Sequence, residues 1–313
     1  MDNIINILCA TDDRYVPYCG IMLTSLFVNN QDSKFRVFVL TDKMSEANIA
    51  SMEKLADKYG NTIQIVKVDA DVLKDCPIRK KDHVSLATYY RLLAPVLLPE
   101  DVGRILYLDC DMVVDGSVKD LWNQDLDDIA LAAVIDEDYL GLSKYERLGL
   151  NPYRKYFNAG VLLINLEYWR EHDVMGRCLE CVASMPEKLL LHDQDTLNFV
   201  LQDEVKLLEV KYNFQTGFLY KGTAMEVPVA QEVMRTINSP VIIHFTGKRK
   251  PWLTHYYHPY VLKFLYYRSI SLWKNYPLVY ILKEDWRYWR HRFKFAMGWK
   301  RRPYITDSQK KKR

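Results

Sequence analysis

The first half of the chain alternates short apolar runs with amphipathic stretches, and this alternation restricts the fold more than any other feature. The expected strands are residues 4–10, 35–40, 62–68 and 104–108. The stretches between them predict helices over residues 17–28, 45–59 and 85–93. Repeated β-α units predict an α/β fold with a mostly parallel sheet covered by helices on both faces. No GxGxxG or GxxxxGK[ST] motif occurs, so neither a dinucleotide-binding fold nor a P-loop is predicted.

The second half is less regular. Its expected strands are residues 129–135, 161–165 and 241–245, and its expected helices are 166–182 and 193–201. The β pattern stops beyond Pro251, which predicts one domain over residues 1–255 and a helical extension over 256–313. The N-terminus lacks a basic segment and reads as a strand, so we expect no signal peptide. No stretch of 18 or more residues is apolar enough to predict a transmembrane helix.

Two aspartates, Asp109 and Asp111, directly follow the strand expected at residues 104–108. In open α/β sheets, ligands bind outside the carboxyl ends of the strands. Side chains two apart on an extended segment point the same way, so both carboxylates can bind one divalent ion. A DxD pattern alone is more typical of a turn than of a metal site, but the apolar runs on both sides favour the metal site. Cys110 between them should point to the opposite side and pack.

A polar loop also follows the strand expected at residues 241–245. It begins with His244, which could be a third metal ligand, although a lone histidine after a strand is more often simply hydrogen-bonded. Gly247 lets the backbone approach an anion, and Lys250 offers a point charge to a phosphate. Two carboxylates and one imidazole would suit Mn²⁺, with Mg²⁺ possible. The Cys178-x-x-Cys181 pair has no second ligand pair and is interpreted as structural.

Four linked motifs carry a family resemblance. They are Tyr107-Leu-Asp109-Cys-Asp111, Phe157-Asn158-Ala-Gly-Val-Leu-Leu-Ile-Asn165, His192-Asp193-Gln194-Asp195-Thr-Leu-Asn198 and His244-Phe-Thr-Gly247-Lys-Arg-Lys250-Pro-Trp252. In this order and spacing, with Ala10-Thr-Asp12-Asp-Arg-Tyr15 before them, they closely resemble glycosyltransferase family 8. That family includes bacterial lipooligosaccharide α-galactosyltransferases and glucosyltransferases, and glycogenin. The resemblance covers roughly residues 4–255.

The resemblance implies a GT-A fold, a UDP-sugar donor, Mn²⁺, and transfer of the sugar with retention of anomeric configuration. The implied metal ligands are Asp109, Asp111 and His244. The implied uridine pocket is Ala10, Asp12 and Tyr15, and the implied diphosphate contacts are Gly247 and Lys250. The implied donor-sugar contacts are Arg91, Asn158, Asp193 and Gln194, with Asp136 on the sugar or acceptor side and His83 near the acceptor.

Catalysis is assigned to Gln194, Asp193 and Asp136 on the same basis. The oxocarbenium-like transition state needs a polar residue on the far face of the sugar, and Gln194 would serve. An amide is a poor nucleophile, so front-side attack within an ion pair is preferred to a covalent intermediate. Asp193 is the alternative nucleophile.

The charge of the chain is unevenly distributed. Residues 283–313 hold 12 Lys/Arg and three acids, for a net charge of +9, whereas residues 1–282 carry −6. Aromatic residues recur at helical spacing within 284–302 among these bases, a pattern typical of an interfacial membrane helix. A solvated helix packed on the domain and a nucleic-acid surface are the alternatives, and the latter lacks any recognised motif.

The sequence therefore predicts a cytoplasmic enzyme at the inner face of the membrane that transfers galactose or glucose from a UDP-sugar to a lipid-linked or cell-envelope glycan. Two alternatives stay open. A metal-dependent nucleotidyltransferase or phosphohydrolase would also use paired aspartates. A non-catalytic sugar-nucleotide-binding membrane protein would keep the fold without turnover.

Overall fold

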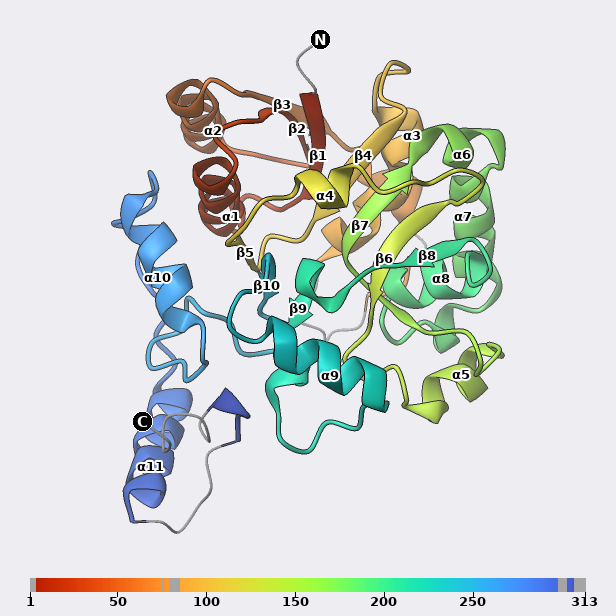
Figure 1. Ribbon diagram of the computed structural model, residues 1–313. Helices are drawn as coiled ribbons and strands as arrows, with labels where there is room; N and C mark the ends of the chain where they lie inside the picture. The colour runs from red at the N-terminus through yellow and green to blue at the C-terminus, as the bar shows by residue number, and fades with distance from the viewer. Residues whose placement is uncertain (1–3, 75, 79–84, 298–302, 307–313) are drawn as a thin grey trace.

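A seven-stranded sheet lies at the centre of the molecule (Figure 1). The computed structural model describes residues 4–74, 76–78, 85–297 and 303–306. Within these residues the strand order is β3-β2-β1-β4-β7-β6-β8. All strands of this sheet run parallel except β7, so the predicted α/β fold with a mostly parallel sheet is confirmed. The strands are β1 (Ile4–Ala10), β2 (Lys34–Thr41), β3 (Thr62–Lys67), β4 (Arg104–Leu108), β6 (Leu131–Ile135), β7 (Phe157–Asn165) and β8 (Val205–Leu207).

A second, three-stranded sheet has the order β5-β10-β9. Its strands are β5 (Met112–Val114), β9 (Phe214–Gln215) and β10 (Ile242–His244). Strand β10 pairs antiparallel with β5 and parallel with β9. In this register His244 lies opposite Met112 on one side and Gln215 on the other. The small sheet therefore carries residues from three distant parts of the chain to one place.

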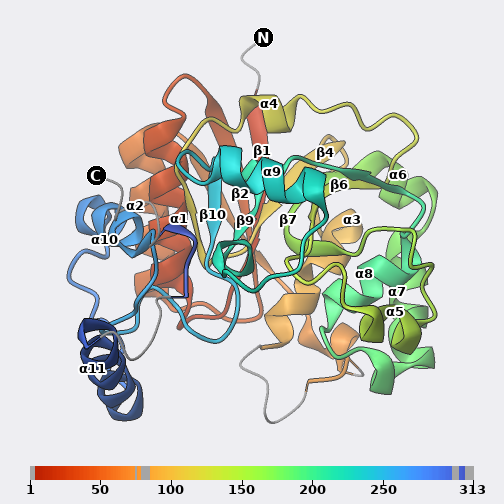
Figure 2. The same ribbon diagram turned by 60° about the horizontal axis from the view of Figure 1, so that its bottom comes forward.

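Helices cover both faces of the large sheet, as the alternation predicts (Figure 2). Along β1, Ile7 packs into the cluster formed with α1, whereas Leu8 packs into the opposite cluster. The first face is covered by α1, α2 and the small sheet, and the second by α3, α6, α7, α8 and a 3₁₀ helix. The α-helices are α1 (Val16–Asn29), α2 (Glu46–Tyr59), α3 (Ala94–Leu97), α4 (Lys119–Trp122), α5 (Leu142–Leu148), α6 (Leu166–Glu171), α7 (Val174–Ser184), α8 (Asp193–Val200), α9 (Val227–Thr236), α10 (Val261–Ile270) and α11 (Leu282–Ala296). The 3₁₀ helices are Ala70–Leu73, Leu86–Leu93, Pro186–Lys188, Val210–Tyr212 and Thr216–Leu219.

Two helix predictions need correction. The helix expected over 166–182 is two helices, because Asp173 adopts φ +45° and its carboxylate accepts a hydrogen bond from Gly176 N at 3.1 Å, which starts α7 anew. The helix expected over 85–93 is a 3₁₀ helix. Pro95 has no N–H for the Arg91 carbonyl, which accepts from Ala94 N instead.

The C-terminal part packs on the first face and then leaves it (Figure 1). Helix α10 lies beside α1, and the Tyr267 hydroxyl donates to Asp115 Oδ1 at 2.7 Å. Helix α11 stands apart from the sheet. After it, Tyr304 is buried at 3% exposure, and Ile305 N donates to Leu219 O at 2.8 Å. In the described part of the chain no helix combines the length and the apolar character needed to cross a bilayer.

Candidate functional site

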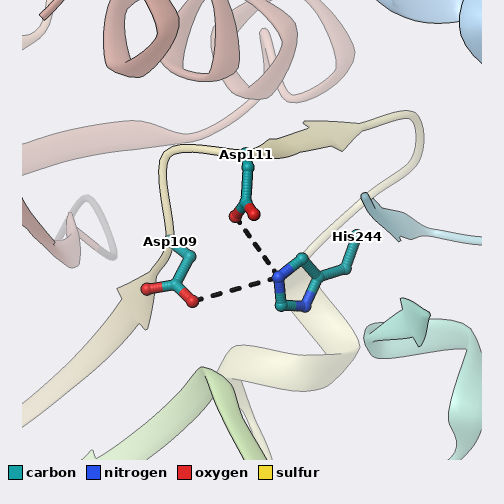
Figure 3. A group of neighbouring side chains, drawn as sticks. All are labelled: Asp109, Asp111 and His244. Atoms are coloured by element: carbon teal, nitrogen blue, oxygen red, sulfur yellow. Dashed lines mark ion pairs between the residues drawn. The ribbon is translucent and has the colours of Figure 1, made fainter. Parts of the chain in front are cut away.

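The candidate metal ligands meet where β4, β5 and β10 come together (Figure 3). Asp109 continues the ladder of β4, since its backbone N donates to Gly160 O on β7 at 2.9 Å. Asp111 directly precedes β5, and its carbonyl accepts from Phe245 N at 3.0 Å. These backbone bonds fix where both carboxylates and His244 lie.

One ligand atom from each of these three residues lies within 4.8 Å of the other two. His244 Nε2 is 3.3 Å from Asp111 Oδ1 and 3.9 Å from Asp109 Oδ2. Two carboxylate oxygens and one imidazole nitrogen facing a common point are a donor set that fits Mn²⁺ or Mg²⁺. Among the described residues, this is the one group of three such side chains close enough to hold an ion. Cys110, between the aspartates, is buried and its thiol donates to Ala10 O at 3.5 Å, as expected for a residue that points to the other side.

Positive charge surrounds the two aspartates. Lys250 Nζ forms an ion pair with Asp111 and donates to Phe245 O at 2.9 Å. Burial opposes ionisation of Asp111, but Lys250 and His244 outweigh it and hold the pKa of this carboxyl well below its ordinary value. The carboxylate therefore stays charged and available to a cation. Gly247, between His244 and Lys250, adopts φ +82°, a conformation that favours glycine.

Arg91 lies behind the metal ligands and is 3% exposed. Its guanidinium contacts Asp109 Oδ1 at 3.1 Å, Asp193 Oδ2 at 3.0 Å and the carbonyl of Ala159. Burial would lower the pKa of Arg91, but the Asp193, Tyr107 and Asp109 partners raise it above its ordinary value. Arg91 thus remains charged and joins the metal motif to the start of α8.

The residues assigned to the sugar side form a second cluster, at the ends of β6, β7 and α8. Gln194 Nε2 donates to Asp136 Oδ2 at 3.1 Å, and Gln194 Oε1 accepts from Asn158 Nδ2 at 3.1 Å and from Ala159 N at 3.0 Å. Lys144 Nζ is 3.1 Å from Asp136 Oδ1. Asp136 is therefore a buried carboxylate with a cationic partner, and Gln194 is held rigidly.

Asp193 is more enclosed than its neighbour Gln194. It is 3% exposed, it accepts a hydrogen bond from the Thr88 hydroxyl, and it pairs with Arg91. Burial raises the pKa of the Asp193 carboxyl, and Arg91 and Thr88 oppose that rise. These contacts are those of a residue that holds Arg91 and Thr88 in place.

The expected uridine pocket adjoins the metal ligands. Ala10 ends β1 beside Cys110, and Asp12 Oδ1 accepts from Tyr15 N at 3.1 Å at the start of α1. The Tyr15 ring lies edge-on to Trp252, with centroids 5.7 Å apart. Burial, followed by the nearby Asp111 carboxylate, raises the pKa of Tyr15 above its ordinary value. His83 lies outside the described residues.

Three further residues join the site without having been expected. Asn213 is fully buried, and its Oδ1 lies 2.9 Å from His244 Nδ1. Glu137 Oε2 accepts from Thr246 Oγ1 at 2.7 Å, which ties the loop after β10 to the end of β6. Lys144 balances Asp136. The available signal for Asn213 was an asparagine set between Tyr212 and Phe214 in an otherwise apolar stretch.

Comparisons with known proteins show the family to which the chain belongs. The family model described as Glycosyl transferase family 8 matches residues 6–255. General stress protein A of Bacillus subtilis is 30% identical over 279 residues, which cover 88% of this chain and 96% of that protein. A lipopolysaccharide 1,2-glucosyltransferase of Escherichia coli is 31% identical over 284 residues, covering 89% of this chain and 82% of that enzyme.

Among solved structures, the galactosyltransferase LgtC in complex with donor and acceptor sugar analogues matches with a TM-score of 0.78 and 29% identity. The match covers 90% of this chain and 99% of LgtC, and it confirms the expected GT-A fold. Because the family model spans most of the chain and these relatives match it nearly end to end, the chain belongs to glycosyl transferase family 8 and is a glycosyltransferase.

Proposed function

We propose that the enzyme transfers a hexose, glucose or galactose, from a UDP-sugar to a glycan, with Mn²⁺ (or Mg²⁺) in the site and with retention of configuration. The observation that carries the proposal is the approach of His244 Nε2 to within 3.3 Å of Asp111 and 3.9 Å of Asp109. The names of two relatives, a glucosyltransferase and a galactosyltransferase, support a hexose donor.

Departure of a nucleoside diphosphate concentrates negative charge beside the metal motif. A divalent ion held by Asp109, Asp111 and His244 would act there as a Lewis acid. Lys250 forms an ion pair with Asp111 and adds a second positive charge beside the phosphates. The positive φ of Gly247 lets the backbone of this loop approach the phosphates. Ala10, at the end of β1, and Tyr15, directly before α1, would hold the uracil ring.

The contacts of the two candidate nucleophiles support one of the two routes by which configuration could be retained. Gln194 Oε1 already accepts two hydrogen bonds, from Asn158 Nδ2 and Ala159 N, so it has little electron density to offer a sugar carbon. The Asp193 carboxylate is buried and paired with Arg91. These contacts support front-side attack, in which Gln194 and Asp136 stabilise the positively charged sugar and no covalent sugar–enzyme bond forms.

The acceptor is proposed to be a lipid-linked or cell-envelope glycan met at the cytoplasmic face of a membrane. Residues 1–255 would carry the chemistry and 256–313 the membrane contact. The support is the surface of α11, on which Trp286, Trp289 and Phe293 are 65%, 55% and 56% exposed beside Arg290 and Arg292. Exposed aromatic rings with cations between them are typical of a helix that lies in a membrane interface.

The test is hydrolysis of a panel of UDP-sugars with Mn²⁺ and no acceptor. We expect UDP-glucose or UDP-galactose to be preferred at least about tenfold over other sugars, which corresponds to roughly 1.4 kcal/mol. No turnover of any UDP-sugar would contradict the proposal and indicate a binding protein.

The metal ligands are tested by Asp109→Ala, which we expect to lower Mn²⁺-dependent hydrolysis roughly a hundredfold or more, since it removes a charged ligand. Asp101→Ala is the matched control, because Asp101 is an exposed partner of Arg36 remote from the metal ligands. Equal activity of the two variants would contradict the metal assignment.

A further inference from the structure

His244 has two ring nitrogens with different partners. Nε2 faces Asp109 and Asp111, and Nδ1 lies 2.9 Å from Asn213 Oδ1. A neutral imidazole carries its hydrogen on one nitrogen and its lone pair on the other. Only the ring with a lone pair on Nε2 can bind a cation between the two aspartates. Whatever fixes the hydrogen on Nδ1 therefore prepares the metal site.

The backbone of β7 fixes that hydrogen through two amides. Gly160 N donates to the side chain of Asn158 at 3.0 Å, and because a backbone N–H needs an acceptor, the Asn158 atom that it meets must be the oxygen Oδ1. Asn213 Nδ2 lies 2.9 Å from the same oxygen and donates to it. Because an amide has one oxygen and one NH₂, the Asn213 oxygen must face His244. The imidazole then has to donate from Nδ1, and in the neutral ring the lone pair lies on Nε2.

The same strand orients the sugar side. Ala159 N donates to Gln194 Oε1 at 3.0 Å, which turns Gln194 Nε2 toward Asp136. Asn158 Nδ2 donates to both Gln194 Oε1 and Asp136 Oδ2, at 3.1 and 3.2 Å. A single chain of hydrogen bonds thus runs, donor to acceptor throughout, from His244 through Asn213 and Asn158 to the carboxylate of Asp136.

Asn213 occupies the central place in this chain. It is 0% exposed, and it lies between the 3₁₀ helix Val210–Tyr212 and β9. Pairing of β9 with β10 puts Gln215 beside His244, so the backbone holds Asn213 next to the imidazole. Every polar atom of its amide has a partner in the network: Oδ1 accepts from His244 and Nδ2 donates to Asn158.

We propose that Asn213 is a positioning residue that sets the tautomer of His244 and couples the metal ligand to the amides that face the sugar. The inference rests on the proposed function in taking Asp109, Asp111 and His244 as the metal site. An orienting partner on the second nitrogen of a metal-binding histidine fixes the ring and typically changes metal affinity about 10- to 100-fold when it is removed.

Two substitutions of Asn213 separate its role in setting the His244 tautomer from its role in coupling His244 to Asn158. Asn213→Asp can still accept a hydrogen bond from His244 Nδ1, but it turns a carboxylate oxygen toward Asn158 Oδ1. Asn213→Leu has a similar size and can make neither bond. Asn30→Asp is the matched control, because Asn30 is also buried and its amide has other partners, Leu26 O, Gly116 O and Val118 N, none of which belongs to the chain from His244 to Asp136.

The measurements use ¹⁵N-histidine-labelled, metal-free protein at a pH at which the His244 ring is neutral, because an imidazolium has a hydrogen on both nitrogens and has no tautomer to report. Long-range ¹H–¹⁵N correlation spectra report the tautomer, and His244→Gln assigns the signal. Free Mn²⁺, followed by electron paramagnetic resonance, reports metal affinity, and UDP-glucose and UDP-galactose hydrolysis reports the sugar side. Thermal unfolding checks that each variant is folded.

We expect the Nδ1–H tautomer in the wild type and in Asn213→Asp. Asn213→Leu should bind Mn²⁺ about 10- to 100-fold more weakly. Asn213→Asp should keep its Mn²⁺ affinity within about threefold yet lose about tenfold or more of donor hydrolysis, because two acceptor oxygens then oppose each other. Asn30→Asp should change neither readout.

Three results would overturn the proposal: an Nε2–H tautomer in the wild type, wild-type Mn²⁺ affinity in Asn213→Leu, or unchanged hydrolysis in Asn213→Asp. A wild-type protein that binds no Mn²⁺ but shows the Nδ1–H tautomer would refute the metal site of the proposed function. The tautomer assignment would still be supported, because it is read without metal.

Discussion

At the scale of single residues, the site depends on close packing as much as on charge. Gly160 on β7 shows this most clearly, because a Cβ added there would lie 2.3 Å from His244 Cε1 and 2.8 Å from His244 Nδ1. The imidazole therefore uses the space that only glycine leaves free. The same residue donates the hydrogen bond that orients Asn158, so one position serves both the packing and the polar network.

Gly160→Ala is therefore expected to displace His244 and to weaken Mn²⁺ binding about tenfold or more. The measurement is a Mn²⁺ titration followed by electron paramagnetic resonance, together with UDP-sugar hydrolysis at saturating metal. Gly222→Ala is the control, since a Cβ at Gly222 meets nothing within 4 Å. If Gly160→Ala bound Mn²⁺ as tightly as Gly222→Ala, the close approach would have no effect on the metal site.

At the scale of elements, local pattern predicted most strands and helices. The runs predicted at 4–10, 62–68 and 104–108 match β1, β3 and β4, although β3 ends at Lys67, and α2 ends at Gly60, which adopts φ +63°. These predictions succeeded because apolar periodicity and a glycine that ends a helix are both visible within the sequence of the element itself. The split between α6 and α7 was missed, because it depends on the conformation of one residue, Asp173.

Helix α11 is the element whose surface is least explained by the fold. Beyond it, the segment Pro303–Ile305 returns to the domain, where Lys221 N donates to Pro303 O at 3.0 Å and the ring of Tyr304 stacks on Tyr220. Deleting the whole tail would therefore also remove a contact with the body of the enzyme. Point substitutions on α11 test the membrane proposal more cleanly.

Replacing Trp286 and Phe293 together by serine is expected to weaken binding to vesicles of anionic and neutral phospholipid by roughly tenfold for each ring, since each buries a large apolar side chain. Sedimentation with vesicles measures this. Tyr153→Ser is the matched control, because Tyr153 is an aromatic residue 90% exposed on another part of the surface. Unchanged sedimentation of the double variant would count against a membrane role for α11.

At the scale of the whole molecule, the excess of basic residues and the candidate site lie in different parts of the chain. Residues 1–282 carry a net charge of −6 and residues 283–313 carry +9. The acidic part contains the candidate metal and sugar residues, which are buried or half-buried and have polar or charged partners. The basic part contains exposed cations such as Arg290 and Arg292. Salt screens exposed charges far more than buried pairs.

Raising NaCl from about 0.1 M to about 1 M shortens the Debye length from about 10 Å to about 3 Å. We therefore expect binding to anionic vesicles to fall steeply over this range, while hydrolysis of a soluble UDP-sugar changes much less. Sedimentation and donor hydrolysis in the same salt series measure the two effects. Parallel loss of both would contradict the separation of membrane contact from chemistry.

The sequence by itself determined the class of fold, the acidic motif after β4 and, through linked motifs, the family. These are local properties: an apolar run, its periodicity and the residues that directly follow it. The strand order, the reversed direction of β7 and the small sheet were decided by tertiary structure. His244 reaches Asp109 and Asp111 only because β10 pairs with β5, and Asn213 reaches His244 only because β9 pairs with β10. Strand pairing depends on contacts between distant segments, which no local pattern specifies.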